Sequence, residues 1–429
     1  MYCGSCLRDN ALAAALQRLG LDVSLVPLYT PIRTDEPDVS LDRVFFGGIN
    51  VWLQQKIPLF RWLPEACDRW LDNPRLIRRV ASRAVNVNAR ELGAMTLSMV
   101  RGEHGHQRKE VHRLVAWMKD EARPDLVCLT NLLVGGCLPA LKRELPGVPV
   151  LVTLQGDDLF LDELDEPWRA KVLAEMKSLA ALADGFVVFN DYYRDRMSDL
   201  FGIPAEKFHR TALGADVKDF APLAGERFSS EAEAEAEAKP VTIGYFARRC
   251  PEKGYDLLVD AFLDLARRPG FERVRLATGG WLSEKDRPFV EAQDARLEST
   301  GLGPRLNPVG SPDTLAGKLD FFRGIDLFCV PARFVEPKGI YALEAMAAGL
   351  PVVGPDRGAF PELLATSGGG RLFPAGDAKA LADTLADLAR DASARRALGR
   401  RGHEWVTANG DRAAMARTTA EVFERFLAP

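Results

Sequence analysis

Residues 325–354 restrict the fold more than any other part of the chain. A mostly apolar run at 325–331 and a second at 350–354 have the length of buried strands. Pro337 cannot lie inside a helix, and Gly349 fits a helix C-terminus, so a helix is predicted between them. Strand, loop, helix and strand in this order predict a parallel sheet with crossover helices.

Two carboxylates flank the start of this predicted helix. Glu336 precedes it and Glu344 lies inside it. A helix N-terminus offers unpaired N–H groups and a positive dipole end, which suit a phosphate. Carboxylates repel a phosphate, but they accept hydrogen bonds from sugar hydroxyls. The stretch therefore indicates a ligand that carries both phosphate and sugar hydroxyls.

Length and composition indicate a globular protein of two or three domains. The chain has 429 residues, with 47% hydrophobic and 27% charged residues. A net charge of −4 provides no overall attraction to nucleic acid, and we predict none as a partner. Peripheral contact with a membrane stays open, because local charged patches are compatible with this net charge. The N-terminus lacks a signal-peptide pattern and no apolar run reaches transmembrane length, so we predict a cytoplasmic protein.

Strand-like and helix-like segments alternate in both halves of the sequence. The predicted strands are 22–28, 124–129, 148–154, 185–189, 241–246, 273–278, 327–330, 351–354 and 370–373. Residues 224–239 break this pattern with alternating Glu and Ala, which is typical of a linker or surface loop. We predict a first domain at 1–223, a second at 240–405 and a C-terminal helix at 406–429.

The chain opens on a glycine turn and a helix, Leu7 to Leu19, where a doubly wound domain normally opens on a strand. Gly4 lies in this turn. We hypothesise that the missing first strand is encoded upstream.

An aromatic-rich segment, residues 45–71, has two interpretations. It contains Trp52 and five further Phe or Trp residues. Its ring faces could meet a sugar or lipid acceptor, or the segment could pack on a small core of its own. The sequence favours neither.

Polar residues follow the strand predicted at 148–154. Gln155 stands directly after it, at the strand end where open α/β sheets place their sites. The acidic run 157–166 could suggest magnesium chemistry, but its spacing does not match a magnesium motif. A loop that caps the following helix is the favoured interpretation.

Two cations follow the first predicted strand of the second domain. Arg248 and Lys253 lie just past residues 241–246. Cations at a strand-end crevice suit a diphosphate, and arginine can bind it through two parallel hydrogen bonds.

These motifs together resemble the family-4 retaining glycosyltransferases (glycosyl transferases group 1). The resemblance rests on Arg248 with Pro251-Glu252-Lys253-Gly254, on Glu336 and Glu344 with seven residues between them, on Ala345 to Val353, and on Gly358 with Pro361-Glu362. It covers nearly all of the second domain. It extends more weakly into the first, at Val187 to Arg194 and at Gly214-Ala215-Asp216.

The resemblance implies an α/β GT-B architecture, with two Rossmann-like parallel-sheet domains facing across a cleft. It implies a nucleotide-sugar donor bound mainly by the second domain, and retention at the anomeric carbon. Carried over by position, Arg248 and Lys253 would hold the diphosphate, Glu336 would contact the donor sugar, and Glu344 would accept from the ribose. The backbone N–H groups of Gly339, Ile340 and Tyr341 would face the phosphate or sugar, and Lys338, Gln155 and Gly4 complete the predicted donor contacts.

The acceptor is expected on the first domain, where the match is weaker. We assign Trp52, Asn131 and Asp157 to it, and the acceptor itself could be a glycan, a lipid-linked sugar or a small metabolite.

The residues agree with this chemistry. A nucleoside diphosphate gains negative charge as it leaves, and Arg248, Lys253 and a helix N-terminus are preorganised donors for that charge. We therefore predict neither a metal nor a cofactor. Neither Glu336 nor Glu344 is an evident nucleophile, so the leaving phosphate is expected to help deprotonate the acceptor on the same face.

Two positions depart from the family pattern. Many relatives carry histidine at the position of Gln155, which can hydrogen-bond a sugar hydroxyl but cannot carry a proton. Relatives commonly have phenylalanine at the position of Lys338, which adds a cation beside the donor site.

We thus predict a metal-independent retaining glycosyltransferase. The alternatives are a non-catalytic sugar-nucleotide-binding or scaffold protein, and a nucleotide-sugar epimerase on the same fold.

Overall fold

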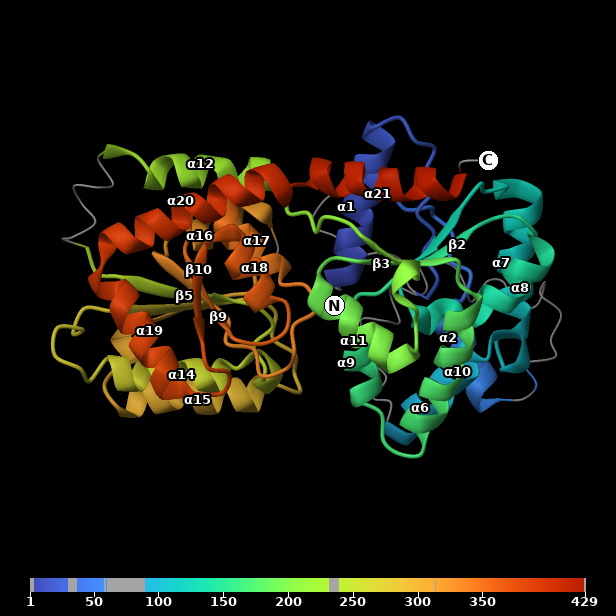
Figure 1. The fold of residues 1–429 in the computed structure, drawn as a ribbon. Helices are drawn as coiled ribbons and strands as arrows, with labels where there is room; N and C mark the ends of the chain where they lie inside the picture. Colours follow the sequence, from blue (N-terminus) through green and yellow to red (C-terminus); the bar gives the residue numbers. More distant parts are fainter. Residues whose placement is uncertain are drawn as a thin grey trace. The chain divides into compact units, whose positions relative to one another are not determined.

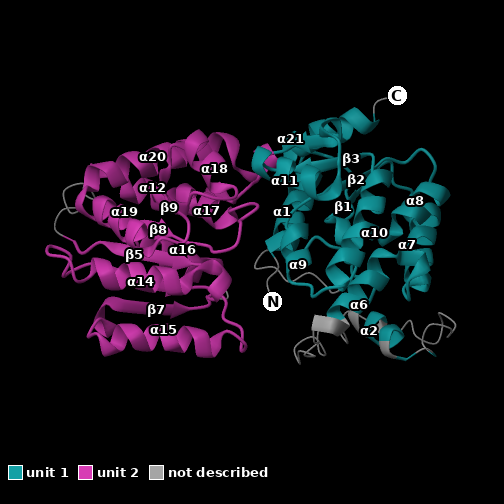
Figure 2. Ribbon diagram, turned by 60° about the horizontal axis from the view of Figure 1, so that its bottom comes forward, with its two compact units in different colours: residues 1–211, 416–429 teal, residues 212–415 magenta. Residues whose placement is uncertain are grey.

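The computed structural model describes residues 4–29, 37–57, 59, 89–230, 239–312 and 314–427. The chain forms two compact units (Figures 1 and 2). Unit 1 comprises residues 1–211 and 416–429, and unit 2 comprises residues 212–415.

Unit 1 is built on a four-stranded parallel sheet. Its strands lie side by side in chain order: β1 (Val127–Leu129), β2 (Val150–Thr153), β3 (Gly185–Val188) and β4 (Phe208–Arg210). Every residue of β2 and β3 is buried, as expected when helices cover both faces of a parallel sheet. The sheet is thus an α/β core of the kind that the alternating pattern predicted.

The helices of unit 1 vary in length. Among the described residues they are α1 (Gly4–Arg18), α2 (Gly48–Lys56), α6 (Ala89–Val100), α7 (Arg108–Trp117), α8 (Leu138–Glu144), α9 (Asp157–Asp162), α10 (Trp168–Leu182) and α11 (Asp191–Phe201), with short helical turns η2 (Gly102–His104), η3 (Met118–Ala122), η4 (Leu132–Cys137) and η5 (Ala205–Lys207). The last helix, α21 (Arg412–Leu427), begins in unit 2 and continues into unit 1. There the ring of Phe426 meets His209 of β4 edge-on, with centroids 5.0 Å apart.

Unit 2 contains a six-stranded parallel sheet. The strands are β5 (Thr242–Phe246), β6 (Arg275–Gly279), β7 (Leu306–Gly310), β8 (Leu327–Cys329), β9 (Val352–Pro355) and β10 (Gly370–Phe373). They lie in the order β10-β9-β8-β5-β6-β7, which is the doubly wound order of a Rossmann fold.

Helices cover both faces of this sheet (Figure 1). α14 (Tyr255–Leu265) contacts both α15 (Arg287–Ser299) and α19 (Ala378–Arg390), whereas α12 (Val217–Arg227) contacts α16 (Leu315–Arg323), α17 (Ile340–Ala347) and α20 (Ala392–Asn409). The remaining helices are α18 (Phe360–Ser367) and the short turns η6 (Pro251–Lys253) and η7 (Gly303–Arg305).

The winding of the chain determines where unit 2 can hold a ligand. From β5 the chain moves outward through β6 to β7, and then returns to place β8 on the other side of β5. The loops after β5 and β8 therefore leave the sheet in opposite directions. A crevice forms at such a switch point, outside the carboxyl ends of the strands.

Several elements differ from the sequence prediction. The strand predicted at 22–28 is wrong: the described residues there form only an isolated bridge between Leu25 and Ser40. Gly4 begins α1 rather than lying in a turn before it. The linker predicted from residue 224 begins inside α12, which continues to Arg227 despite containing Pro222. Residues 231–238 of the predicted linker lie outside the described residues.

The aromatic segment contributes to the core at its beginning. Phe45 and Phe46 are 1% and 6% exposed and pack with Val51. The ring of Phe45 lies 5.0 Å from that of Trp117. For these two rings the structure favours packing over acceptor contact, whereas residues 60–71 lie outside the described part.

No helix among the described residues is long and apolar enough to cross a membrane.

Candidate functional site

The loops after β5 and β8 touch each other at the switch point of unit 2. Backbone N–H groups of Arg333 and Phe334 donate to Glu252 O, at 2.8 and 3.3 Å. Gly254 ends the β5 loop with φ +70°, and a Cβ on it would lie 1.9 Å from Pro331 O. Only glycine permits this approach, which brings the cations after β5 next to the carboxylate after β8.

Glu336 is the centre of this contact. Lys253 Nζ lies 2.8 Å from its Oε2, and the Tyr341 hydroxyl donates to the same oxygen at 2.9 Å. Its Oε1 accepts the backbone N–H groups of Lys338 and Gly339, at 3.4 and 3.3 Å. Glu336 is 6% exposed. Its carboxylate accepts hydrogen bonds from one ammonium, one hydroxyl and two backbone amides.

These partners keep Glu336 ionised. Burial alone would raise its pKa, but the charge and hydrogen bond of Lys253 outweigh that effect, with help from Tyr341 and Lys338. The net result is a pKa below the ordinary value for glutamate. Glu336 is therefore a fixed anion, suited to accepting a hydrogen bond from a ligand hydroxyl.

The turn after a third strand, β9, also contacts the loop that carries Glu336. Ala359 N donates to Glu336 O at 2.8 Å, in the turn after β9. Gly358, with φ +65°, comes so close that a Cβ would lie 2.5 Å from the same oxygen. The position of Glu336 thus depends on the loops after β5, β8 and β9.

Lys253 is held on several sides. Its ammonium lies over the rings of Phe334 and Tyr341, 4.5 and 4.6 Å from their centroids, besides its ion pair with Glu336. Arg248 differs, since its side chain is 41% exposed and its ion pair with Glu252 is 3.7 Å long. The site therefore combines one fixed cation with one cation that can reorient toward a ligand.

The start of α17 leaves backbone donors available. Gly339 precedes the helix in a left-handed conformation, without a side-chain cap. The N–H groups of Ile340 and Tyr341 have no backbone acceptor among the described residues. They lie beside Glu336, and their predicted role in binding an anion stays a prediction.

Glu344 lies one turn further along α17. Its Oε1 is 2.5 Å from Lys318 Nζ of α16, and the two side chains are 17% and 18% exposed. The sequence analysis missed Lys318, because it belongs to no motif and approaches Glu344 only through the packing of two helices.

The remaining predicted residues belong to unit 1. Gln155 Nε2 donates to Thr130 O at 2.8 Å, and Asp9 lies 3.4 Å from the same nitrogen. Gly4 is exposed at the start of α1, and Trp52 is partly buried in α2. Asn131 caps η4 by accepting Val134 N at 3.2 Å. Their predicted roles in binding stay predictions.

Asp157 is a buried residue of α9. It is 1% exposed and accepts the N–H groups of Leu132 and Gln155, at 2.7 and 3.2 Å. Burial raises its pKa to about 6, partly opposed by these hydrogen bonds. Its present partners are backbone groups, and its predicted role toward an acceptor stays a prediction.

No group of three or more His, Cys, Asp or Glu side chains with the geometry of a metal site occurs in the described part of the chain.

Two protein families together match most of the sequence. Residues 9–214 match the glycosyl transferase 4-like domain, and residues 227–405 match the glycosyl transferases group 1.

Curated relatives agree with these families. The chain is 30% identical over 276 residues to D-inositol 3-phosphate glycosyltransferase of Saccharomonospora viridis, covering 62% of each protein. It is 29% identical over 226 residues to a GDP-mannose-dependent phosphatidylinositol monomannoside mannosyltransferase of Mycobacterium tuberculosis, covering 51% of this chain and 56% of that protein. The chain thus spans less than two thirds of the length of these relatives.

Solved structures share the fold. Sucrose-phosphate synthase from Thermosynechococcus elongatus superposes with a TM-score of 0.67 at 20% identity, covering 97% of this chain and 92% of that one. HepE of Anabaena, crystallised with UDP, superposes with a TM-score of 0.64 at 17% identity, covering 94% of this chain and 100% of that one. Both sheets, the switch-point site and these matches lead to one conclusion: the chain belongs to the family-4 glycosyltransferases and has the GT-B fold.

Proposed function

We propose that this protein transfers a hexosyl unit from a nucleoside-diphosphate sugar to a carbohydrate or lipid-linked acceptor, with retention at the anomeric carbon. One observation carries the proposal. At the switch point of unit 2, a fixed Lys253–Glu336 pair stands beside the open N-terminus of α17 and the half-exposed Arg248. This arrangement offers positive charge for a diphosphate and an oxygen acceptor for a sugar hydroxyl.

Arg248, Lys253 and the N–H groups of Ile340 and Tyr341 would stabilise the departing diphosphate. Negative charge grows on the phosphate oxygens as the glycosidic bond breaks, and fixed donors lower the energy of that transition state. Lys253 needs no reorganisation, because two rings and a carboxylate already hold it. Removing one such donor typically lowers the rate about a hundredfold or more.

The two carboxylates would orient the donor. Glu336 is ionised and buried, so it would accept a hydrogen bond from a hydroxyl of the donor sugar. Glu344 lies one turn further from the helix start and would accept from the ribose hydroxyls. Because Lys318 already pairs with Glu344, the ribose would join an existing ion pair rather than meet an isolated charge.

The reaction would proceed without a metal ion and without a protein nucleophile. Side chains and backbone amides would supply the positive charge that a metal ion could otherwise provide. Glu336 is saturated with donors, which makes it a poor nucleophile. The leaving phosphate would instead accept the proton of the acceptor hydroxyl on the face where the new bond forms.

Lys338 would add specificity. Its backbone N–H binds Glu336, and its charge contributes to the lowered pKa of that carboxylate. A cation at this place suits a donor phosphate, an anionic sugar or an anionic acceptor. Lys338→Ala should therefore raise the KM of the donor or of the acceptor, whereas unchanged values for both substrates would remove Lys338 from the site.

The names of relatives support this class of reaction. They include GDP-mannose-dependent transferases that act on phosphatidylinositol monomannoside, and HepE has been crystallised with UDP-glucose. We place the acceptor on unit 1, where Trp52, Asn131 and Asp157 are the candidate contacts.

A donor screen tests the function. UDP-, GDP- and ADP-sugars are incubated with the protein in the presence of EDTA, with and without glycan or glycolipid acceptors, and products are followed by mass spectrometry and by the anomeric proton signal. Transfer or slow hydrolysis that Lys253→Met abolishes, with an unchanged anomeric configuration, supports the proposal. Donor binding without turnover would indicate a scaffold protein, and conversion of one nucleotide sugar into another would indicate an epimerase.

A further inference from the structure

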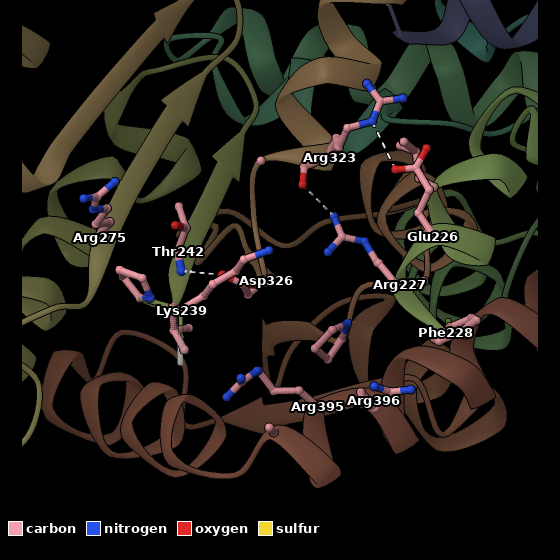
Figure 3. A pocket seen from close by; sticks show the side chains of 17 residues that line it. Glu226, Arg227, Phe228, Lys239, Thr242, Arg275, Arg323, Asp326, Arg395 and Arg396 are labelled. Atoms are coloured by element: carbon pink, nitrogen blue, oxygen red, sulfur yellow. Dashed lines mark hydrogen bonds and ion pairs between the residues drawn. The ribbon is translucent and has the colours of Figure 1, made fainter. Parts of the chain in front are cut away.

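Unit 2 has a pocket of about 500 Å³ at the amino-terminal edge of its sheet, opposite the edge that carries the donor site (Figure 3). Its walls include Thr242, Arg275, Asp326 and Pro351, which stand at or just before the first residues of β5, β6, β8 and β9. The volume lies within the range of roughly 300–1,000 Å³ that is common for small-molecule sites.

Cationic side chains outnumber acidic ones in this pocket. The cationic residues are Arg227, Lys239, Arg275, Arg323, Arg395 and Arg396, and the acidic residues are Glu226 and Asp326. Glu226 pairs with Arg323 at 3.2 Å, and Asp326 accepts Thr242 N at 2.7 Å. The first residue of α20, an 18-residue helix, also lines the pocket, and the carboxylate of Asp391 caps this helix end by accepting Ala394 N at 2.8 Å.

Three of the arginines, Arg227, Arg395 and Arg396, contact neutral carbonyls. Arg227 Nε donates to Ala348 O at 3.0 Å, and Arg395 NH1 donates to Leu388 O and Ala389 O, at 2.6 and 2.8 Å. Carbonyl groups orient a guanidinium but do not neutralise it. Burial lowers the pKa of Arg227 to about 10, although Asp326 and Glu226 oppose that effect. The buried cations therefore carry a desolvation cost that an anion would offset.

Capping of helix ends explains only some of these cationic side chains. Arg227 and Arg395 bond the last carbonyls of α17 and α19, which is a structural role. Arg275 has no such role: its side chain is exposed at the start of β6 and forms no hydrogen bond or ion pair with a described residue.

We propose that this pocket binds a small phosphorylated metabolite of about the size of a sugar phosphate. The planar guanidinium group matches a phosphate through paired hydrogen bonds, and several are present. The pocket is larger than inorganic phosphate needs, so part of it would hold the uncharged portion of the ligand. This binding is separate from donor binding, because the two sites occupy opposite ends of the strands.

Titration calorimetry with the full-length chain tests the proposal, with glucose 6-phosphate, inorganic phosphate and glucose as probes. Glucose 6-phosphate should bind saturably and more tightly than phosphate, while glucose should not bind. Arg275→Glu should weaken binding about tenfold or more, because it replaces a charged hydrogen-bond donor by a repelling charge. Arg267→Glu, an exposed position of the same unit outside the pocket, should have no such effect.

The donor site provides the decisive control. Arg248→Gln should leave glucose 6-phosphate binding unchanged. Binding that Arg248→Gln removes and Arg275→Glu spares would place the anion at the donor site and overturn the proposal. So would the absence of saturable binding, or equal affinity for phosphate and glucose 6-phosphate, which would indicate an adventitious anion only. A thermal melt of each variant shows that it is folded.

Discussion

Lys253 Nζ of the β5 loop and Glu336 Oε2 of the β8 loop lie 2.8 Å apart, and their side chains are only 15% and 7% exposed. A buried pair of this kind contributes little net stability, because desolvation offsets much of the attraction. Its structural effect is to fix one cation and one anion where the winding of the sheet reverses. The first prediction separates this effect on folding from the effect on catalysis.

Lys253→Met should lower the free energy of unfolding by about 3 kcal/mol, because it leaves Glu336 as a buried charge without its cation. Chemical denaturation measures this loss. Lys253→Met combined with Glu336→Gln should recover most of the stability, since no unpaired charge remains. Both proteins should transfer sugar at least about a hundredfold more slowly than the wild type. Recovery of activity together with stability in the double variant would show that the pair has a structural role alone.

Gly254→Ala should destabilise the protein more than Gly270→Ala. Both glycines have positive φ, +70° and +88°, so alanine is strained by about 1–2 kcal/mol at either place. Only at Gly254 would the new Cβ meet another atom, 1.9 Å from Pro331 O, whereas nothing lies within 4 Å of the Cβ position at Gly270. The β5 and β8 loops must then separate, so nucleotide affinity should fall in Gly254→Ala and not in Gly270→Ala. Equal melting temperatures for the two variants would contradict the close approach.

Glu344→Gln should raise the KM for the donor at least about tenfold with a smaller change in kcat, because ribose contacts are the same in the ground and transition states. The wild type should prefer ribonucleoside over 2′,3′-dideoxyribonucleoside diphosphates, and the variant should lose this preference. Lys318→Met serves as the control, since it removes the partner of Glu344 but keeps the carboxylate. A retained ribose preference in Glu344→Gln would show that another residue binds the ribose.

Asp157 should make stability depend on pH between about 4 and 6. Its pKa is about 6 in the folded protein, above the value of 3.8 for an unperturbed carboxyl, because burial disfavours its charged form. The folded protein therefore binds more protons than the unfolded chain in this window. The resulting stabilisation amounts to about 1.4 kcal/mol per unit of pKa shift. It is complete below about pH 4 and is lost as the pH rises through 6.

The test compares urea unfolding of the wild type and Asp157→Asn at pH 4, 5, 6 and 7. Relative to the variant, the wild type should lose stability as the pH rises. Other carboxyl groups titrate in both proteins and cancel in the difference. A constant difference across this range would mean that Asp157 titrates normally.

Most strands of unit 2 were predictable from sequence. The strands predicted at 241–246, 351–354 and 370–373 lie within one residue of β5, β9 and β10 at each end, because each is a short segment bounded by turn residues. β7 was missed, since Leu306–Gly310 contains a proline and is mostly exposed. β4 was missed because its sequence, Phe-His-Arg, carries no apolar run.

Contacts between distant segments could not be predicted. The spacing of Glu336 and Glu344 predicted two donor carboxylates, but nothing in it indicated that Lys318 would meet Glu344 or that the Tyr341 hydroxyl would meet Glu336. These contacts depend on how helices pack and how loops cross. The basic pocket at the opposite edge was missed for the same reason, since its arginines come from four separate segments.

The central claim is that the switch point of unit 2 binds the diphosphate of a nucleotide sugar. The most direct measurement is the calorimetric titration of UDP and of GDP, in EDTA, into the wild type, Arg248→Gln and Arg267→Gln. We predict saturable binding of at least one nucleotide to the wild type, weakened about tenfold or more by Arg248→Gln and unchanged by Arg267→Gln. Failure of both nucleotides to bind, or equal affinity in all three proteins, would contradict the claim.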